Sequence, residues 1–429
     1  MKWKSLFFAG LLGGVMSCSP TRGLVKILAE TESSFKDNTG FALYDPVSKK
    51  ALVDYHSDRY FTPASNTKIF TFYAALKLLG DTLPSLKYEL RNDSLLVWGM
   101  GDPSFLNPYV FQNGKTFNFL KSRKENIFLS TNNFNAPRLG DGWAWDDYLY
   151  SYSPERSPFP LYGNLFTVSK MVSGELETSP TYFYKQVVKS SDIHAREEIV
   201  RAFDTNQLIY YPGKTPTTEW EIPYHVTNEV LADLLSDTLK QNVSVLNMPL
   251  PANATLLRGT PADSLYKVMM EESDNFIAEQ LLLQCAAVVS DTLSSEIAIR
   301  YATQNLLADL PDKLQWVDGS GLSRFNLFTP RTIVKLWEKI YSEVPRERLF
   351  TLLAKGGKSG TIKNWYKAEP IFIYGKTGTL SNNHCLSGFL ITKSGKTLIF
   401  SMMSNNFVAS STELRKQMEK IFKVIYEKY

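Results

Sequence analysis

The stretch Tyr374-Gly375-Lys376-Thr377-Gly378-Thr379-Leu380 (YGKTGTL) allows two incompatible interpretations, and the choice between them decides the fold. Its Gly-Lys-Thr could belong to a phosphate-binding loop, or its Lys-Thr-Gly could line a site where a serine is acylated. A phosphate loop requires a glycine five positions before the glycine of Gly-Lys-Thr, because its backbone must wrap around an anion. That position is Pro370, which has no backbone N–H and a fixed φ, so the stretch is not a phosphate loop.

The acylation interpretation requires a nucleophilic serine with an amine nearby, and Pro63-Ala64-Ser65-Asn66-Thr67-Lys68 supplies both. These residues lead into a mostly apolar segment, 65–79, which predicts a buried helix ended by Gly80. Residues three apart share one face of a helix, so the Lys68 amine can reach the Ser65 hydroxyl. The N-terminus of a helix also favours negative charge that develops on a substrate.

A second motif, Ser273-Asp274-Asn275, opens another predicted helix over 273–289 and provides a hydroxyl and an amide. Lys376-Thr377-Gly378 is expected on a strand, where Gly378 would let a substrate backbone approach closely. Each triplet alone is weak, since Ser-x-x-Lys is common by chance and Lys-Thr-Gly is often a plain turn. Their occurrence together, in this order and each at the start of an element, favours the active-site set of penicillin-recognising serine acyltransferases.

Composition and charge exclude several other classes of function. A formal net charge of +4 is small for 429 residues and argues against a nucleic-acid partner held by a broad basic surface. The four histidines are scattered and the three cysteines lie far apart, so neither a metal site nor a cofactor is expected. Cys285 and Cys385 are compatible with a disulfide and equally with two buried thiols.

Residues 1–18 predict an export signal, with a short basic start and an apolar run from Leu6 to Val15. The following Val15-Met16-Ser17-Cys18 is similar to a bacterial lipobox, which predicts that Cys18 becomes the lipidated first residue. Ordinary cleavage nearby, leaving a free periplasmic protein, is the alternative. No later segment has the ~18 charge-free apolar residues that a membrane span needs. We therefore expect an exported protein of the periplasm or cell envelope, attached to a membrane only through a lipid at Cys18.

The chain is too long for one ordinary core, which predicts more than one domain. Its middle is rich in Tyr, Phe, Asn, Ser and Pro and has short strand patterns, whereas helical patterns dominate after residue 260. A strand pair at 384–404 and an amphipathic helix at 411–427 close the chain. We predict an α/β (α+β) fold: a domain from 19–83 plus 256–429, an inserted domain from 84–167 plus 223–255, and a second, nested insertion at 168–222.

Several longer stretches resemble the class C low-molecular-mass penicillin-binding proteins, the D-alanyl-D-alanine carboxypeptidase/endopeptidases. They are FTPASNTKIFTFYAALKLLG (61–80), GWAWDDYLYSY (142–152), DGSGLSRFNLFTP (318–330), GKTGTL (375–380) and LSGFLITKSGKTLIFSMMSNN (386–406). The resemblance implies a penicillin-recognising serine transpeptidase/β-lactamase-like domain with a β-rich insertion. The distance from position 65 to position 273, 208 residues, leaves room for that insertion. Class A β-lactamases place the second motif much closer to the first, and they carry a Glu-x-x-Leu-Asn motif that is missing downstream of Asn275.

By this resemblance, Ser65 attacks the carbonyl between two D-alanines and forms an acyl-enzyme. Lys68 is the expected base, because we expect no histidine near any of the three motifs. Its pKa must then be lowered, by burial and by repulsion from Lys376, towards ~7 to 8. The remaining implied roles are proton relay (Ser273), orientation of Lys68 (Asn275), binding of the terminal carboxylate (Lys376, Thr377, Thr379), close substrate approach (Gly378) and oxyanion binding by the N–H groups of Ser65 and Thr379.

Two further residues are implied to contact the substrate. Asp147 is expected to meet the free amine of a diamino acid in the stem peptide, and the alternative is a solvated acidic turn flanked by packed tryptophans. Arg324 is expected to meet a substrate carboxylate or to be structural. The partners implied are peptidoglycan stem peptides, with β-lactam antibiotics as covalent inhibitors. A β-lactamase or esterase with the same site, and a non-catalytic peptidoglycan-binding module, are the alternative functions, although the five intact acylation residues disfavour the module.

Overall fold

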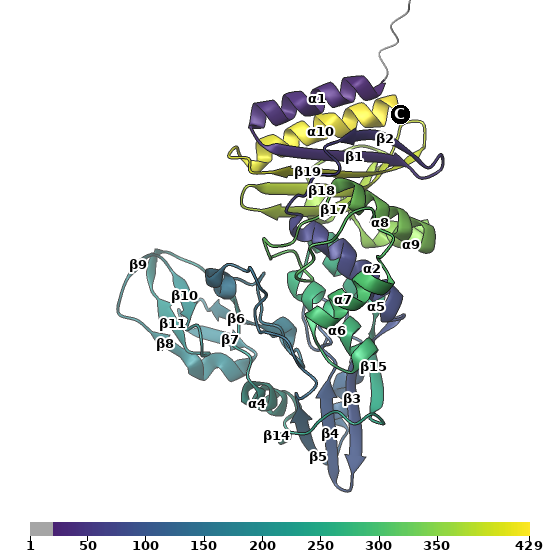
Figure 1. The fold of residues 1–429 in the computed structure, drawn as a ribbon. Coiled ribbons are helices and arrows are strands. Elements are labelled where there is room, and N and C mark those ends of the chain that lie inside the picture. Colours follow the sequence, from purple (N-terminus) through teal and green to yellow (C-terminus); the bar gives the residue numbers. More distant parts are fainter. Residues whose placement is uncertain (1–19) are drawn as a thin grey trace, which may run out of the picture.

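Residues 20–429 are described by a computed structural model of the chain (Figure 1). Residues 1–19 lie outside the described residues, and with them the predicted signal segment and Cys18. Within residues 20–429, no helix is long and apolar enough to cross a membrane. In that same part of the chain, His, Cys, Asp and Glu side chains form no group of three or more that could hold a metal ion.

A six-stranded antiparallel sheet forms the frame of the molecule, and both ends of the chain contribute to it. In spatial order its strands are β16 (Ala354–Lys355), β17 (Ile373–Leu380), β18 (Asn383–Ile391), β19 (Thr397–Asn405), β1 (Asn38–Asp45) and β2 (Lys50–Tyr55). β1 pairs with β19, with Asn38 opposite Asn405. The N-terminal segment is therefore locked to the predicted closing hairpin, β18–β19, and brings the helix that follows β2 close to β17.

Helices cover both faces of this sheet (Figure 1). α1 (Pro20–Phe35) and α10 (Ser411–Lys428) lie side by side on one face and share an apolar core with the strands. α8 (Pro330–Glu343) covers the other face, where Nε1 of buried Trp337 donates a 2.9 Å hydrogen bond to Ser387 Oγ. The other helices on that side are α2 (Lys68–Leu78), α5 (Ala262–Lys267), α6 (Asn275–Ser290), α7 (Ser295–Asn305) and α9 (Arg346–Leu352).

A second sheet extends away from these helices, as Figure 1 shows. In spatial order its strands are β14 (Val243–Val245), β5 (Asn126–Ser130), β4 (Ser94–Gly99), β3 (Thr82–Arg91) and β15 (Thr255–Pro261). α3 (Lys115–Lys121) and α4 (Asn228–Leu239) pack beside it. Because β15 pairs with β3, the sheet joins residues from both sides of the domain boundary predicted at 256.

The rest of the β-rich region consists of three small sheets, ordered β13-β6-β7, β10-β11-β8 and β12-β9. Their strands are β6 (Leu165–Lys170), β7 (Leu176–Ser179), β8 (Val187–Lys189), β9 (His194–Arg196), β10 (Glu198–Arg201), β11 (Leu208–Tyr211), β12 (Gly213–Thr215) and β13 (Glu219–Pro223). β6 and β13 pair across the boundaries predicted at 168 and 222. One apolar core contains Leu86 and Ile127 of the first predicted insertion and Phe183 and Tyr210 of the second, so the residues of both predicted insertions are packed together.

Two of the predicted helices begin later than the sequence pattern suggests. Ala64 has a left-handed φ of 47°, and the residues after it form a 3₁₀ turn, η1 (Ala64–Thr67), before α2 starts at Lys68. Ser273 has a left-handed φ of 70°, so α6 starts at Asn275, with the Asp274 side chain accepting from Ile277 N at 2.8 Å. In both cases the serine of the motif stands on a turn, outside the α-helix.

Candidate active site

The 3₁₀ turn that carries Ser65 lies directly against strand β17. The Asn66 amide joins them, because its Nδ2 donates to the Lys376 carbonyl at 3.1 Å. Gly378 permits this approach, since a Cβ at that position would stand 2.4 Å from the Pro63 carbonyl oxygen. Gly378 was predicted to make space for a substrate, but the protein's own backbone fills that space.

The Lys68 amine is the centre of the site and has three hydrogen-bond partners. It lies 2.9 Å from Ser65 Oγ, 2.5 Å from Asn275 Oδ1 and 2.7 Å from the Ser320 carbonyl oxygen. Two of these partners can only accept, whereas a hydroxyl can also donate. A neutral amine would use its two N–H groups on Asn275 and Ser320, which leaves its lone pair facing the Ser65 hydroxyl. The arrangement can therefore take a proton from Ser65.

The pKa of Lys68 is lowered from its ordinary value to about 8, because the side chain is fully buried. The carboxylates of Asp318, Asp274 and Glu279 oppose this shift by stabilising the ammonium form. The pKa of Lys376 is lowered well below its usual range, first by burial and then by repulsion from Lys68. Burial is therefore the main cause of the lowered pKa of both lysines, and the predicted repulsion between the two amines adds to it.

Lys376 and Thr377 lie behind the surface of the site. The fully buried Lys376 amine donates to Ser273 Oγ at 2.6 Å and to the Thr377 carbonyl at 2.9 Å. The Thr377 hydroxyl donates to Thr361 Oγ1 at 2.6 Å, and its residue is 6% exposed. These two members of the third motif are thus bonded to the protein itself, and Thr379 is the motif's exposed neighbour.

A cleft of about 870 Å³ opens over these groups. Of the residues predicted to act in the site, it is lined by Ser65, Ser273, Asn275, Thr379, Asp147 and Arg324. Lys68, Lys376, Thr377 and Gly378 are buried and do not line the cleft. The structure thus brings residues from five separate stretches of sequence to one opening, with the two amines beneath it.

Asp147 lies on a 3₁₀ turn (Trp145–Leu149), and its Oδ1 accepts a 2.8 Å hydrogen bond from the Tyr152 hydroxyl. The flanking tryptophans are not both packed as predicted, because Trp145 is 78% exposed. Trp143 is packed, and its Nε1 donates to Asp318 Oδ2 at 2.9 Å. Asp147 is therefore a half-buried side chain on the wall of the cleft, with one carboxylate oxygen already bonded to Tyr152.

Two residues near Thr379 were not predicted from the sequence. Nδ1 of His384 lies 2.8 Å from Thr379 Oγ1, because the β17–β18 register places the two residues opposite each other. The expectation that no histidine approaches the motifs is therefore wrong. Burial lowers the pKa of His384 to about 3, so the ring binds a proton too weakly to act as the base. Arg415 of α10 donates to the same Thr379 hydroxyl at 3.4 Å. Hairpin register could have indicated His384, but no local signal indicates Arg415.

The two cysteines of the described chain are separate buried thiols. Burial raises the pKa of both thiols, which keeps them protonated and unreactive. The structure thus decides against the disulfide that the sequence left open.

Serine enzymes that react with penicillin share this combination of a serine–lysine pair, a Ser-Asp-Asn turn and a Lys-Thr-Gly strand. The fold of this chain and the residues around its cleft place it in that class of enzymes. The chain belongs to the D-Ala-D-Ala carboxypeptidase 3 (S13) family, whose model matches residues 22–427. The predicted resemblance to class C low-molecular-mass penicillin-binding proteins is thereby confirmed.

Individual relatives agree with this assignment. The chain is 23% identical over 435 residues to D-alanyl-D-alanine carboxypeptidase DacB of Haemophilus influenzae, covering 88% of this chain and 87% of the relative. It is 24% identical over 432 residues to penicillin-sensitive carboxypeptidase A of Dictyostelium discoideum, covering 84% and 81%. The crystal structure of Haemophilus influenzae penicillin-binding protein 4 superposes with a TM-score of 0.74 at 22% identity, over 95% of this chain and 99% of that one. That match confirms the predicted fold class.

Proposed function

We propose that this protein hydrolyses the bond between the two D-alanines that end a peptidoglycan stem peptide, and the equivalent bond after D-alanine in cross-links. The observation that supports this most directly is the 2.9 Å contact between the Lys68 amine and the Ser65 hydroxyl at the floor of the cleft. A D-alanyl peptide or a β-lactam would meet the same nucleophile, so β-lactams are expected to act as covalent inhibitors.

In the acylation step, Ser65 Oγ attacks the carbonyl carbon while its proton passes to the Lys68 amine. The negative charge on the carbonyl oxygen would be held by the backbone N–H groups of Ser65 and Thr379. Asn275 and the Ser320 carbonyl keep the amine oriented throughout, since each accepts one of its N–H groups.

The peptide bond breaks when the departing D-alanine nitrogen receives a proton. Ser273 is suited to deliver it, because its hydroxyl lies at the cleft surface and accepts from the buried Lys376 amine, whose ammonium form would replace the proton that Ser273 gives up. Water then attacks the Ser65 ester and loses one proton through Ser273 to Lys376, while the proton held by Lys68 returns to Ser65 Oγ, and the shortened peptide leaves.

Substrate recognition is assigned to residues around the cleft. The terminal carboxylate would lie near Thr379, with Lys376 and Thr377 behind it; a carboxylate placed there would favour the protonated form of Lys376. Asp147 is assigned to the free amine of a diamino acid in the stem peptide, because its carboxylate is open to the cleft. Arg324, also on the cleft wall, is assigned to a substrate carboxylate.

A substrate in the cell wall requires the enzyme to reside in the cell envelope. We assign residues 1–18 to an export signal and Cys18 to lipid attachment, as the lipobox-like sequence indicates. Expression of the full chain with a radiolabelled fatty acid tests the anchor: label should enter the wild-type protein but not the Cys18→Ala variant. Label in both proteins, or in neither, would contradict lipidation at Cys18.

The function itself is tested by incubating the purified protein with intact cross-linked peptidoglycan and identifying the released fragments by mass spectrometry. Release of D-alanine and of uncross-linked stem peptides is expected, and Ser65→Ala should release neither. The alternative, a β-lactamase with the same acylation site, predicts rapid turnover of a β-lactam instead of a long-lived acyl-enzyme. Product formation from penicillin, followed over many turnovers, separates the two.

A further inference from the structure

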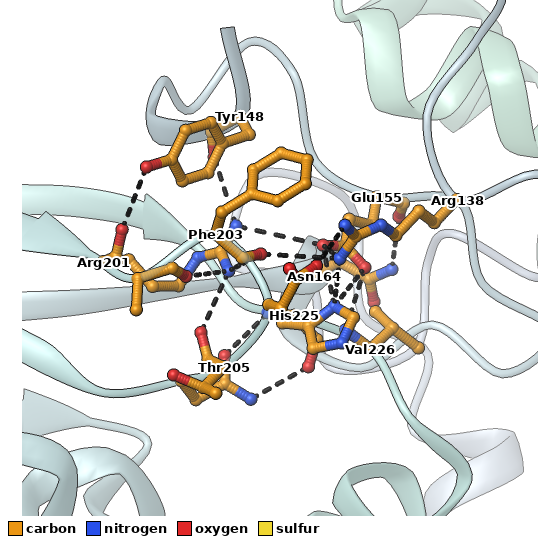
Figure 2. A network of polar contacts seen from close by, with 12 residues as sticks. Arg138, Tyr148, Glu155, Asn164, Arg201, Phe203, Thr205, His225 and Val226 are labelled. Carbon is orange, nitrogen blue, oxygen red and sulfur yellow. Dashed lines mark hydrogen bonds and ion pairs between the residues drawn. The ribbon is translucent and has the colours of Figure 1, made fainter. Parts of the chain in front are cut away.

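The segment Tyr152–Arg156 links the β-rich region to the acylation site through residues outside the three motifs. Its Glu155 is held on the β-rich side, as Figure 2 shows. The buried carboxylate lies 3.0 Å from His225 Nδ1 and accepts from Val226 N at 3.0 Å. Asn164 Nδ2 donates to the Glu155 carbonyl at 2.8 Å. The backbone at position 155 is therefore fixed by several partners.

The next side chain, Arg156, makes its ion pair with the other part of the molecule. Its Nε and Nη2 donate to the same oxygen of Glu279 on α6, Oε2, at 2.9 and 2.6 Å. Arg156 is 3% exposed and Glu279 is 1% exposed, so solvent screens neither charge. Removing either partner would leave an uncompensated charge in the interior, which is strongly unfavourable.

The second oxygen of Glu279 connects this ion pair to the base. Oε1 accepts from the backbone N–H of Ser320 at 2.7 Å, and the carbonyl of Ser320 accepts from Lys68 Nζ at 2.7 Å. The adjacent Gly321 has a φ of +84°, and a Cβ there would stand 1.9 Å from the Ala64 carbonyl oxygen, so this loop position is tightly constrained. Three contacts thus lead from the Arg156 guanidinium to the Lys68 amine.

We infer that the buried Arg156–Glu279 ion pair positions Lys68, the base of the acylation step. Glu279 fixes the Ser320 backbone, whose carbonyl contacts Lys68, and Arg156 neutralises the charge of Glu279. Both are positioning residues, because neither lines the cleft or contacts the reacting atoms. The inference rests on the proposed function, since it concerns the base of that reaction.

The charges around Lys68 determine in which direction each substitution would shift its protonation. Asp274 faces Lys68 from the turn before α6, and Glu279 faces it from α6 itself. Asp318 faces Lys68 from the loop after α7, and Lys376 faces it from β17. Without the Arg156 charge, the carboxylate of Glu279 would favour the ammonium form of Lys68 more strongly. Without the Glu279 carboxylate, the remaining Arg156 charge would disfavour that ammonium. The two single substitutions should therefore act in opposite directions.

The experiment measures the second-order rate constant for acylation by a fluorescent penicillin between pH 5.5 and 10. The acid limb is the part of the profile where the rate rises with pH. For Arg156→Gln we expect this limb to shift to higher pH by on the order of one pH unit, with about tenfold slower acylation at pH 7. For Glu279→Gln the limb should move down. The double variant should return close to the wild-type limb. Arg156→Lys, which keeps the charge but loses the forked contact, should keep the limb and lower the plateau several-fold.

Arg348→Gln is the matched control, because Arg348 makes a forked ion pair with Asp263 on elements away from Lys68. It should leave the profile unchanged. Limbs that stay in place in both single variants, with only a lower melting temperature, would show a purely structural ion pair and overturn the inference. If Arg156→Gln does not fold, Glu279→Gln and Arg156→Lys decide the question in the same way. A wild-type protein that is not labelled by penicillin would instead contradict the proposed function.

Discussion

The Lys376 amine lies 2.6 Å from the Ser273 hydroxyl, inside the protein and not at the surface of the cleft. Burial and the neighbouring Lys68 both favour its neutral form, so Lys376 gives the empty site little positive charge. A carboxylate bound near Thr379 would reverse that preference by stabilising the ammonium. Under the proposed function, the third motif would therefore have two connected functions, binding a carboxylate and supplying a protonated partner to Ser273.

The nucleophile assignment gives the first prediction. Ser65→Ala should abolish covalent labelling by fluorescent penicillin, because within residues 20–429 no other hydroxyl on the cleft wall contacts the Lys68 amine. Labelled protein is detected after denaturing electrophoresis. Ser273→Ala serves as the comparison: it keeps the nucleophile, so it should still reach full labelling, but more slowly. Stoichiometric labelling of Ser65→Ala would remove Ser65 from the mechanism.

The lowered pKa of Lys68 sets the pH dependence of acylation. A base must be deprotonated to accept a proton, so the rate should increase with pH and level off above the pKa of about 8. Lys68→Arg should lose this dependence together with most of the rate, at least about 10²-fold, because a guanidinium is always protonated. Stopped-flow measurement of acylation by a chromogenic β-lactam gives the profile. A flat wild-type profile from pH 6 to 9 would contradict Lys68 as the base.

Substrate selectivity is expected to depend on Asp147. Asp147→Asn keeps the shape of the side chain and removes its charge, so it should lower kcat/KM for stem peptides with a free diamino-acid amine by about tenfold, the effect of losing one hydrogen bond between charged groups. A simple acyl-D-Ala-D-Ala peptide without that amine should be hydrolysed at the wild-type rate. Asp146→Asn, at the adjacent position in the same cleft, is the comparison variant. Equal losses on both substrates would make Asp147 a structural residue.

Much of the fold and the acylation set could be predicted from the sequence, because local signals specify them. The helix pattern at 65–79, the closing hairpin and the serine–lysine spacing each lie within a short stretch. The exceptions have a common cause. Packing between elements distant in sequence brings three residues close to the site, and no periodic pattern predicts it. These residues are Arg156, Glu279 and Arg415. The burial of Lys376 is also a tertiary effect, since an exposed and a buried lysine on a strand have the same local sequence.

The domain limits stay predictions, because a sequence does not show which strands pair. Composition changes gradually between regions, whereas strand pairing is set by register. β15 pairs with β3 across the predicted boundary at 256, and β6 pairs with β13 across those at 168 and 222. A shared core then packs the two predicted insertions together. Long-range pairing of this kind leaves no mark in a single sequence beyond short strand patterns.

The buried histidine beside Thr379 predicts how stability depends on pH. His384 has a folded-state pKa of about 3, whereas an unfolded histidine titrates near ~6.5. Between these values the unfolded chain binds more protons than the folded one, so stability must fall as pH is lowered through that window. His384→Gln can still hydrogen-bond to Thr379 but does not titrate. Between pH 7 and 4.5, the free energy of unfolding should therefore decrease by about 2 to 3 kcal/mol less in the variant than in the wild type.

Urea unfolding followed by tryptophan fluorescence at several pH values measures this difference. His194→Gln is the control variant, because His194 is partly exposed and lies on β9 of the β-rich region. The same variant also tests the contact with the active site: if His384 orients the Thr379 hydroxyl, His384→Gln should raise KM for D-Ala-D-Ala peptides more than it lowers kcat. Identical slopes for His384→Gln and the wild type would mean that the histidine titrates freely in the folded protein, against its burial between β17 and α10.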